Sequence, residues 1–289
     1  MEDKVVIVTG ATNGIGEITA LELARMGATV VVISRNQTKL ERTVSKIKSE
    51  TGNDNISYIQ ADLSSLADIR NAVDQFLSQF QRLDVLLNNA GAYFAERKES
   101  VDGYEMTLAL NHLNYFYLTH LLLDTLKATA AEQGEARVVN VSSGAHNSSK
   151  INFNDFQAQD YNGFRRYGET KLMNVLFTYE LDRRLQGTNV TVNALHPGFV
   201  NTGFGMNNEG LMTKFLGILQ NLVAISPEKG AETNIYLASS PEVKGISGKY
   251  WDKKQQKRSS DTSYDVAVQD RLWQLSEDLT GITEAVPVP

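Results

Sequence analysis

The chain of 289 residues contains no cysteine, which excludes a disulfide framework, a thiolate metal site and a cysteine nucleophile. Proline is scarce: all five prolines lie between 197 and 289, so none interrupts a helix or central strand earlier in the chain. Apolar runs fall far short of the roughly 20 residues of a spanning helix. We therefore expect no membrane span, no signal peptide and a cytoplasmic protein.

An excess of positive charge is also lacking, because 28 basic residues face 34 acidic ones and the formal net charge is -6. This balance offers no general attraction for phosphate backbones, so we expect no nucleic-acid partner. The four histidines lie far apart and show no metal-binding spacing. We therefore expect no metal site.

Short β-branched runs alternate with longer helical patterns through the first two thirds of the chain. This alternation predicts parallel strands joined by crossover helices, and therefore an α/β fold with one Rossmann-type, doubly wound parallel sheet flanked by helices. We expect a single domain over 1–289, with an apolar substrate lid at about 199–226 and a C-terminal helical extension at about 262–280. Strands are predicted at 5–8, 29–34, 56–60, 84–88, 136–143, 189–197 and 248–251, and one continuous helix at 108–126.

A glycine-rich loop follows the first predicted strand and leads directly into a helix. Three glycines in seven positions allow a sharp turn and a close approach of the backbone, and the helix N-terminus attracts a pyrophosphate. The loop therefore predicts a dinucleotide site, although an ordinary strand-to-helix turn is the alternative. Its candidate residues are Gly10, Thr12, Asn13, Gly14, Ile15 and Gly16.

The second predicted strand ends at Ser34 and Arg35, where dinucleotide folds commonly place an acidic residue that binds the ribose. The nearest acid that follows is Glu41. A guanidinium pairs well with a 2′-phosphate, so the sequence favours NADP(H), with NAD(H) less favoured. The alternative is that Arg35 is a solvated charge at a strand end.

Tyr167 and Lys171 are four residues apart and share one face of a predicted helix. A nearby ammonium is expected to lower the phenol pKa, which suits a proton donor and acceptor. Ser143 ends the fifth strand, and Asn111 lies in an apolar helix where an unpaired amide is costly. A turn cap and a satisfied buried amide are the alternatives for these two residues.

Together these motifs resemble the short-chain dehydrogenase/reductase family over nearly the whole chain. TGATNGIG, NNAG, YGETK and HPGFVNT carry the resemblance, with Ser143 and Asn111. The stretch between Ser143 and Tyr167, the FTYELDRRL helix and the GKYW and RLWQLSEDLTG segments are most similar to the retinol dehydrogenase and WW-domain oxidoreductase branch.

The resemblance implies hydride transfer between NADP(H) and a small hydrophobic aldehyde or ketone, or the corresponding alcohol. Tyr167 would exchange the proton, Lys171 would lower the tyrosine pKa and bind ribose, Ser143 would orient the carbonyl, and Asn111 would hold a relay water. A homo-oligomer is possible by analogy. The remaining implied cofactor contacts are Asp62, Leu63, Asn89, Ala90, Gly91, Pro197, Gly198, Val200 and Thr202.

Two other functions stay open at this point. One is reduction of a carbon-carbon double bond, as in the more distantly similar protochlorophyllide reductases. The missing cysteines weigh against it, since those enzymes typically carry cysteines in the active site. The other is a catalytically idle NADP sensor, which would have no chemical need for the set of Ser143, Tyr167 and Lys171.

Overall fold

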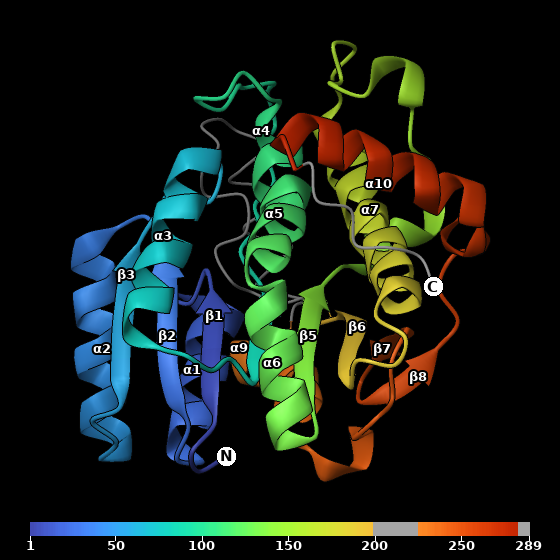
Figure 1. Cartoon of the computed structure of the whole chain (residues 1–289). Helices are drawn as coiled ribbons and strands as arrows, with labels where there is room; N and C mark the ends of the chain where they lie inside the picture. The colour runs from blue at the N-terminus through green and yellow to red at the C-terminus, as the bar shows by residue number, and fades with distance from the viewer. Residues whose placement is uncertain (199–224, 283–289) are drawn as a thin grey trace.

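The computed structural model describes residues 1–198 and 225–282. Its centre is an eight-stranded sheet in the order β3-β2-β1-β4-β5-β6-β7-β8 (Figure 1). All neighbouring strands are parallel except β8, which runs antiparallel to β7. The predicted α/β fold with a doubly wound sheet is therefore confirmed. The strands are β1 (Val5–Thr9), β2 (Thr29–Ser34), β3 (Ile56–Gln60), β4 (Val85–Asn88), β5 (Ala136–Val141), β6 (Val190–His196), β7 (Lys249–Asp252) and β8 (Gln255–Lys257).

Helices cover both faces of the sheet because alternate strand residues point to opposite sides. In β1, Val6 and Val8 join the core shared with α1 and α2, whereas Ile7 joins the core shared with α3 and α5. Each face therefore has its own apolar layer. The main helices are α1 (Gly14–Arg25), α2 (Gln37–Thr51), α3 (Leu66–Gln79), α5 (Asn114–Leu121), α6 (Leu123–Gln133), α7 (Gly163–Arg184), α9 (Pro227–Ser239) and α10 (Val266–Thr280).

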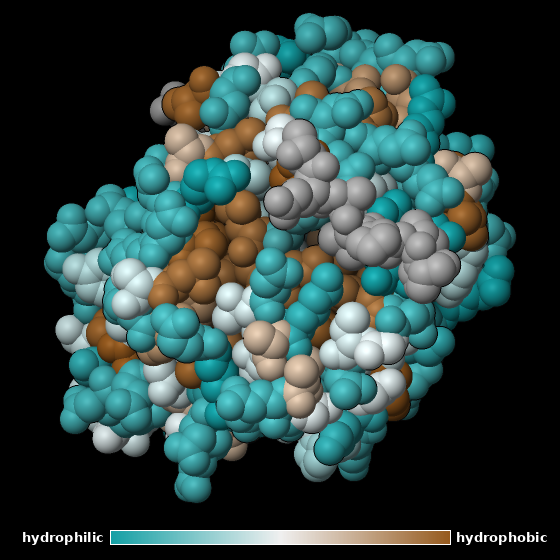
Figure 2. Space-filling model, in the orientation of Figure 1, coloured by the Kyte–Doolittle hydropathy of each residue, from teal (hydrophilic) through white to brown (hydrophobic). Residues whose placement is uncertain are grey.

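The side that carries α3 and α5 shows an apolar area among mostly polar surface residues (Figure 2). Leu66 and Leu77 of α3, and Leu110 and Leu121 before and within α5, are partly buried hydrophobic residues that pack on this core. Within 1–198 and 225–282, none of the helices combines the length and the apolar character needed to cross a bilayer.

The helix predicted over 108–126 is not continuous. It consists of α4 (Met106–Leu108), a π-helical turn η1 (Ala109–Leu113), α5 and α6, with Leu122 between the last two. The π-helical turn contains Asn111, whose buried side chain bonds the backbone of Ala92. An apolar pattern predicts a helix but carries no signal for such an insertion.

The C-terminal region also differs from the sequence prediction. The exposed residues Lys253 and Lys254 form the turn of a hairpin between β7 and β8, which the sequence did not predict, and both have positive φ values (52° and 61°). The last helix, predicted from about 262, begins at Val266 because the Asp265 carboxylate accepts the N–H groups of the first turn.

Candidate functional site

A cleft of about 1730 Å³ opens where the parallel strands end, including the point between β1 and β4 where the strand order reverses. Most predicted site residues line it. Gly14 and Asn111 do not, and Val200, Thr202 and the predicted lid up to 224 lie outside the described residues. The predicted residues that line the cleft are Gly10, Thr12, Asn13, Ile15, Gly16, Ser34, Arg35, Asp62, Leu63, Asn89, Ala90, Gly91, Ser143, Tyr167, Lys171, Pro197 and Gly198.

The glycine loop has a backbone that side chains would disrupt. Gly10 and Gly14 have φ values of 66° and 53°, in the left-handed region. A Cβ atom on Gly10 would come within 2.8 Å of the Ala90 Cα, and one on Gly16 within 2.5 Å of the Asn89 Nδ2. The loop therefore lies directly against the NNAG segment after β4.

Thr9 joins these two segments. Its Oγ1 accepts the backbone N–H groups of Asn89 (2.9 Å) and Ala90 (3.0 Å), and its carbonyl accepts the Asn89 amide (2.9 Å). Asn13, at the N-cap of α1, makes no capping bond with its side chain. The side chain of Asn13 thus leaves the N–H groups of the first turn uncapped at a helix end whose residues line the cleft, which suits a pyrophosphate.

The end of β2 carries positive charge. Thr12 Oγ1 and Ser34 Oγ are 3.3 Å apart, while Arg35 and Lys39 are exposed and line the cleft. Among the described residues, Asp62 supplies the one acidic side chain that lines the cleft. Lys39 was missed in the sequence. Asn36 could have indicated it, because asparagine is a common helix N-cap and Lys39 then lies in the first turn of the helix. In the structure the Asn36 side chain accepts the Lys39 N–H (2.9 Å).

Tyr167, Lys171 and Ser143 come together at the other end of the cleft. The Lys171 Nζ lies 5.6 Å from the centroid of the Tyr167 ring and donates to the Val141 carbonyl at 3.0 Å. Ser143 forms a hydrogen bond with Tyr167 and also accepts the Ala145 N–H (3.2 Å), so it caps the turn as well. The predicted trio therefore forms one cluster.

The electrostatics of this cluster differ from the prediction. Tyr167 lines the cleft and is half-buried, and desolvation by the surrounding protein raises its pKa to about 12, which the Ser143 hydrogen bond only partly opposes. Burial lowers the pKa of Lys171 to about 7. The expected lowering of the tyrosine pKa is therefore not found in this structure, because desolvation outweighs the Ser143 hydrogen bond.

Asn111 lies behind the cleft rather than on its wall. Its Oδ1 accepts the Ala92 N–H at 2.8 Å, and its Nδ2 donates to the Ala92 carbonyl (3.0 Å) and to Thr170 Oγ1 (3.2 Å). A Cβ atom on Gly91 would meet both Asn111 Oδ1 (3.2 Å) and Lys171 Nζ (3.3 Å). Asn111 and Lys171 thus converge behind Gly91, and the amide is satisfied within the protein.

Aromatic and apolar side chains line part of the remaining cleft, and polar side chains line the rest, including those of Lys98, Lys150 and Arg165. Tyr93 and Phe164 have ring centroids 4.8 Å apart, and Phe164 is 58% exposed. Phe94, Met106 and Leu110 also line this part. Together with the Tyr167 hydroxyl, they can hold an apolar molecule that has one polar group.

The histidines act as hydrogen-bond partners. The His196 Nδ1 accepts the Gly144 N–H at 3.1 Å beside the cleft, and the His146 Nε2 accepts the Ser260 N–H at 3.2 Å. Across 1–198 and 225–282, no three His, Asp or Glu side chains are grouped as metal ligands.

Comparison with known proteins places these features in a family. The sequence model of the short chain dehydrogenases matches residues 4–210. Human retinol dehydrogenase 13 is 42% identical over 96% of this chain and 85% of its own length. Human polyprenol dehydrogenase is 40% identical over 98% of this chain and 86% of its own length. The predicted likeness to retinol dehydrogenases is confirmed.

Solved structures give the same fold. An uncharacterised protein from Mycobacterium paratuberculosis superposes with a TM-score of 0.78 at 31% identity, covering 97% of this chain and 94% of that one. The 3-ketoacyl-(acyl-carrier-protein) reductase of Brucella melitensis, complexed with NADH, has a TM-score of 0.68 at 27% identity and covers 87% and 96%. Pseudomonas aeruginosa RhlG, in a complex with NADP, has a TM-score of 0.69 at 27% identity and covers 86% and 94%. Relatives at this distance therefore include both cofactor types.

Proposed function

The chain belongs to the short-chain dehydrogenase family of oxidoreductases, and on that premise we propose that it transfers a hydride between NADP(H) and a hydrophobic aldehyde or ketone, or the corresponding alcohol. The observation that carries the proposal is the cluster of Tyr167, Lys171 and Ser143 at the end of a cleft whose other end is a glycine loop fitted for a pyrophosphate.

The residues of the cleft have distinct tasks in this proposal. When bound, the nicotinamide supplies or accepts the hydride. Tyr167, with a pKa raised to about 12, is a neutral phenol that donates its proton to an alkoxide during reduction. Ser143 orients the carbonyl oxygen. Lys171, with a pKa of about 7, can return a proton to Tyr167 near neutral pH.

Selectivity for NADP(H) rests on the charge at the end of β2. Arg35 and Lys39 are exposed there, and Glu41, the nearest acid that follows, accepts hydrogen bonds from Gln37 and Tyr58. A 2′-phosphate would meet two cations and no adjacent carboxylate. We expect Arg35→Asp to weaken NADPH binding about tenfold or more and to leave NADH binding nearly unchanged. Arg42→Asp, on α2 but outside the cleft, is the matched control, and equal losses for both cofactors would contradict the assignment.

The substrate class follows from the aromatic part of the cleft. Tyr93, Phe94 and Phe164 line the same cleft as Tyr167, which suits a hydrophobic carbonyl compound. A cytoplasmic location is part of the proposal, because the net charge of -6 gives no general attraction to anionic lipid. Fractionation of cells that produce the full chain tests this location.

The decisive experiment follows NADPH absorbance with a panel of aldehydes, ketones and retinal. Wild type is expected to turn over at least one apolar carbonyl compound, and Tyr167→Phe to lose about a thousandfold in kcat with unchanged NADPH binding. Tyr236→Phe is the control, because Tyr236 is a half-buried tyrosine on α9 that does not line the cleft. Tight NADPH binding without any turnover dependent on Tyr167 would instead support the idle sensor. Turnover confined to conjugated double bonds would support the carbon-carbon reductase.

A further inference from the structure

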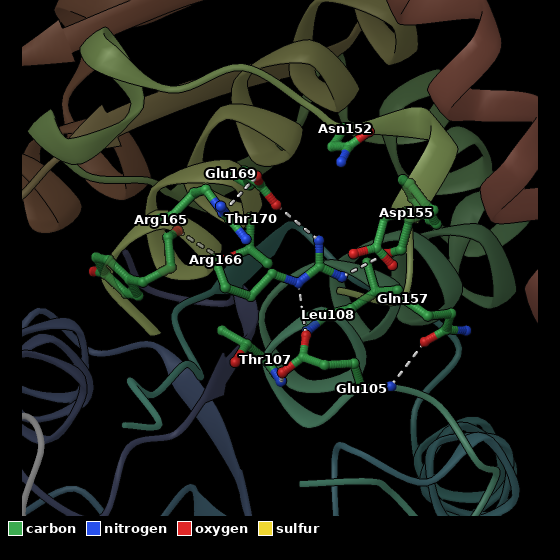
Figure 3. A network of polar contacts seen from close by, with 12 residues as sticks. Glu105, Thr107, Leu108, Asn152, Asp155, Gln157, Arg165, Arg166, Glu169 and Thr170 are labelled. Carbon is green, nitrogen blue, oxygen red and sulfur yellow. Dashed lines mark hydrogen bonds and ion pairs between the residues drawn. The ribbon is translucent and has the colours of Figure 1, made fainter. Parts of the chain in front are cut away.

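A buried ion cluster joins α7, the helix that carries Tyr167, to Glu105, and none of its three side chains lines the cleft. The Arg166 guanidinium lies between two carboxylates, with its Nε 2.7 Å from Glu105 Oε2 and its Nη1 3.1 Å from Glu169 Oε2 (Figure 3). Its Nη2 also donates to the Phe156 carbonyl at 2.8 Å. The side chains of Arg166 and Glu105 are 2% and 0% exposed, so solvent does not share these contacts.

Glu105 connects the cluster to the segment that carries Asn111. Its Oε1 accepts the Thr107 N–H at 2.7 Å and its Oε2 accepts the Leu108 N–H at 2.9 Å, so both oxygens cap α4. The π-helical turn with Asn111 begins one residue after α4. The Glu105 backbone is held in turn by the Gln157 side chain, which accepts its N–H at 2.9 Å.

Arg166 connects the same cluster to α7, directly before Tyr167. The two elements meet a second time where the Asn111 Nδ2 donates to Thr170 Oγ1 at 3.2 Å. Two tethers therefore join the segment 105–111 to the first two turns of α7, one through an ion pair and one through an amide. The π-helical turn is an irregular insertion between α4 and α5, and the two tethers fix its position against α7.

Stability alone is a poor reason for such a cluster. Removing charges from water costs several kcal/mol per ion, and well-packed apolar replacements are often equally stable. The guanidinium also faces two carboxylates, and burial raises the pKa of Glu169. What the cluster supplies is geometry, because the planar guanidinium donates in fixed directions to Glu105, Glu169 and the Phe156 carbonyl.

We propose that Arg166 and Glu105 are positioning residues, which hold the Asn111 turn in register with Tyr167 and Lys171. This inference rests on the proposed function, since the position matters for proton transfer at Tyr167. Arg166 acts through the backbone of α7 and Glu105 through the cap of α4. Neither lines the cleft.

The first test is Arg166→Lys, which replaces the planar guanidinium by a single ammonium. The matched control is Arg184→Lys, which changes a second largely buried arginine on α7, whose Nε lies 2.6 Å from Glu180 Oε1. Both variants are expected to lose some thermal stability. Only Arg166→Lys is expected to lose about tenfold or more in kcat, with an unchanged KM for NADPH, because small misplacements slow chemistry strongly. Equal kcat values for the two variants would overturn the proposal.

A second set of variants separates an effect of the cluster on the position of the reacting groups, measured by kcat, from its effect on protein stability, measured by melting temperature. Arg166→Met leaves the carboxylates of Glu105 and Glu169 buried without this partner, whereas Glu105→Gln/Arg166→Met/Glu169→Gln removes all three charges. We expect the triple variant to recover melting temperature relative to Arg166→Met while its kcat stays low. Recovery of kcat together with melting temperature would reduce the cluster to a structural role.

Amide hydrogen exchange provides a readout that needs no substrate. In Arg166→Lys, protection over 105–114 is expected to fall, while Arg184→Lys keeps it. Unchanged protection in Arg166→Lys would contradict the tether even in a protein without measurable turnover. If wild type reduces no carbonyl compound, the proposed function fails, and the exchange data still decide whether the tether exists.

Discussion

The two ends of the cleft are built in different ways. At the cofactor end, glycines and hydrogen bonds to the backbone form the site. Gly10 lies against Ala90, and Thr9 accepts N–H groups of the NNAG segment. At the catalytic end, buried side chains from segments far apart in the chain converge, with Asn111 and Lys171 meeting behind Gly91.

This difference predicts different responses to substitution. The cofactor end depends on close approach and on φ values, so added atoms should damage it through sterics. The catalytic end depends on desolvation and on hydrogen-bond geometry, so substitutions there should alter rate constants and pH dependence more than stability.

After that of Tyr167→Phe, the largest effect is expected from Ser143→Ala at the catalytic end. Loss of the hydroxyl that orients the carbonyl oxygen should lower kcat about a hundredfold or more, with unchanged affinity for NADPH. Steady-state kinetics and NADPH fluorescence titration measure the two quantities. If Ser143→Ala weakened NADPH binding by as large a factor as it lowered kcat, the prediction that the two ends have separate functions would be wrong.

At the cofactor end, Gly10→Ala is compared with Gly52→Ala, which has a similar φ (66° against 69°) but open space around it. The left-handed backbone costs both variants about 1 kcal/mol. The contact with Ala90 should cost Gly10→Ala a further ~2 kcal/mol of unfolding free energy and weaken NADPH binding. Urea denaturation measures the difference, and equal losses would show that close approach is unimportant.

The pH dependence should report on the catalytic end. Lys171, with a pKa of about 7, loses its proton as pH rises and can then no longer return one to Tyr167. We expect kcat/KM for carbonyl reduction to fall about tenfold per pH unit above that pKa. A profile that stays flat to about pH 9 would exclude Lys171 as the group in the proton path.

The smallest effects compare the two helix caps. Asn36 caps α2 at the cofactor end by accepting the Lys39 N–H, and Asn162 caps α7 at the catalytic end by accepting the Arg165 N–H. Substitution by alanine should cost each variant about 1 kcal/mol of stability. Asn36→Ala should raise the KM for NADPH, and Asn162→Ala should lower kcat. The same kinetic change in both variants would argue against separate roles.

Much of the fold could be predicted because its signals are local. Alternating runs and helical patterns predicted the parallel sheet, and β2 was predicted with its observed bounds. The β7–β8 hairpin was not predicted, because Gln255 to Lys257 are exposed polar residues without an alternating pattern. The π-helical turn at Asn111 was missed because the apolar pattern around it continues unbroken.

The candidate site divides in a similar way. Residue identity and spacing were enough to select Tyr167, Lys171 and Ser143, and the structure brings them together. Lys39 and the Arg166 cluster were missed. A sequence does not show whether a charged residue is exposed or buried. Only the folded chain shows that Arg166 lies between Glu105 and Glu169.

By itself, the sequence determined the sheet and the glycine loop and predicted that Tyr167, Lys171 and Ser143 lie together, because periodicity, glycine and fixed spacing act over short stretches of chain. Only the tertiary structure decided the electrostatics of that cluster. Burial raises the pKa of Tyr167 to about 12 and lowers the pKa of Lys171 to about 7. The atoms that bury these groups come from β5, the Asn111 turn and α7 together, and desolvation depends on their assembly rather than on any one segment.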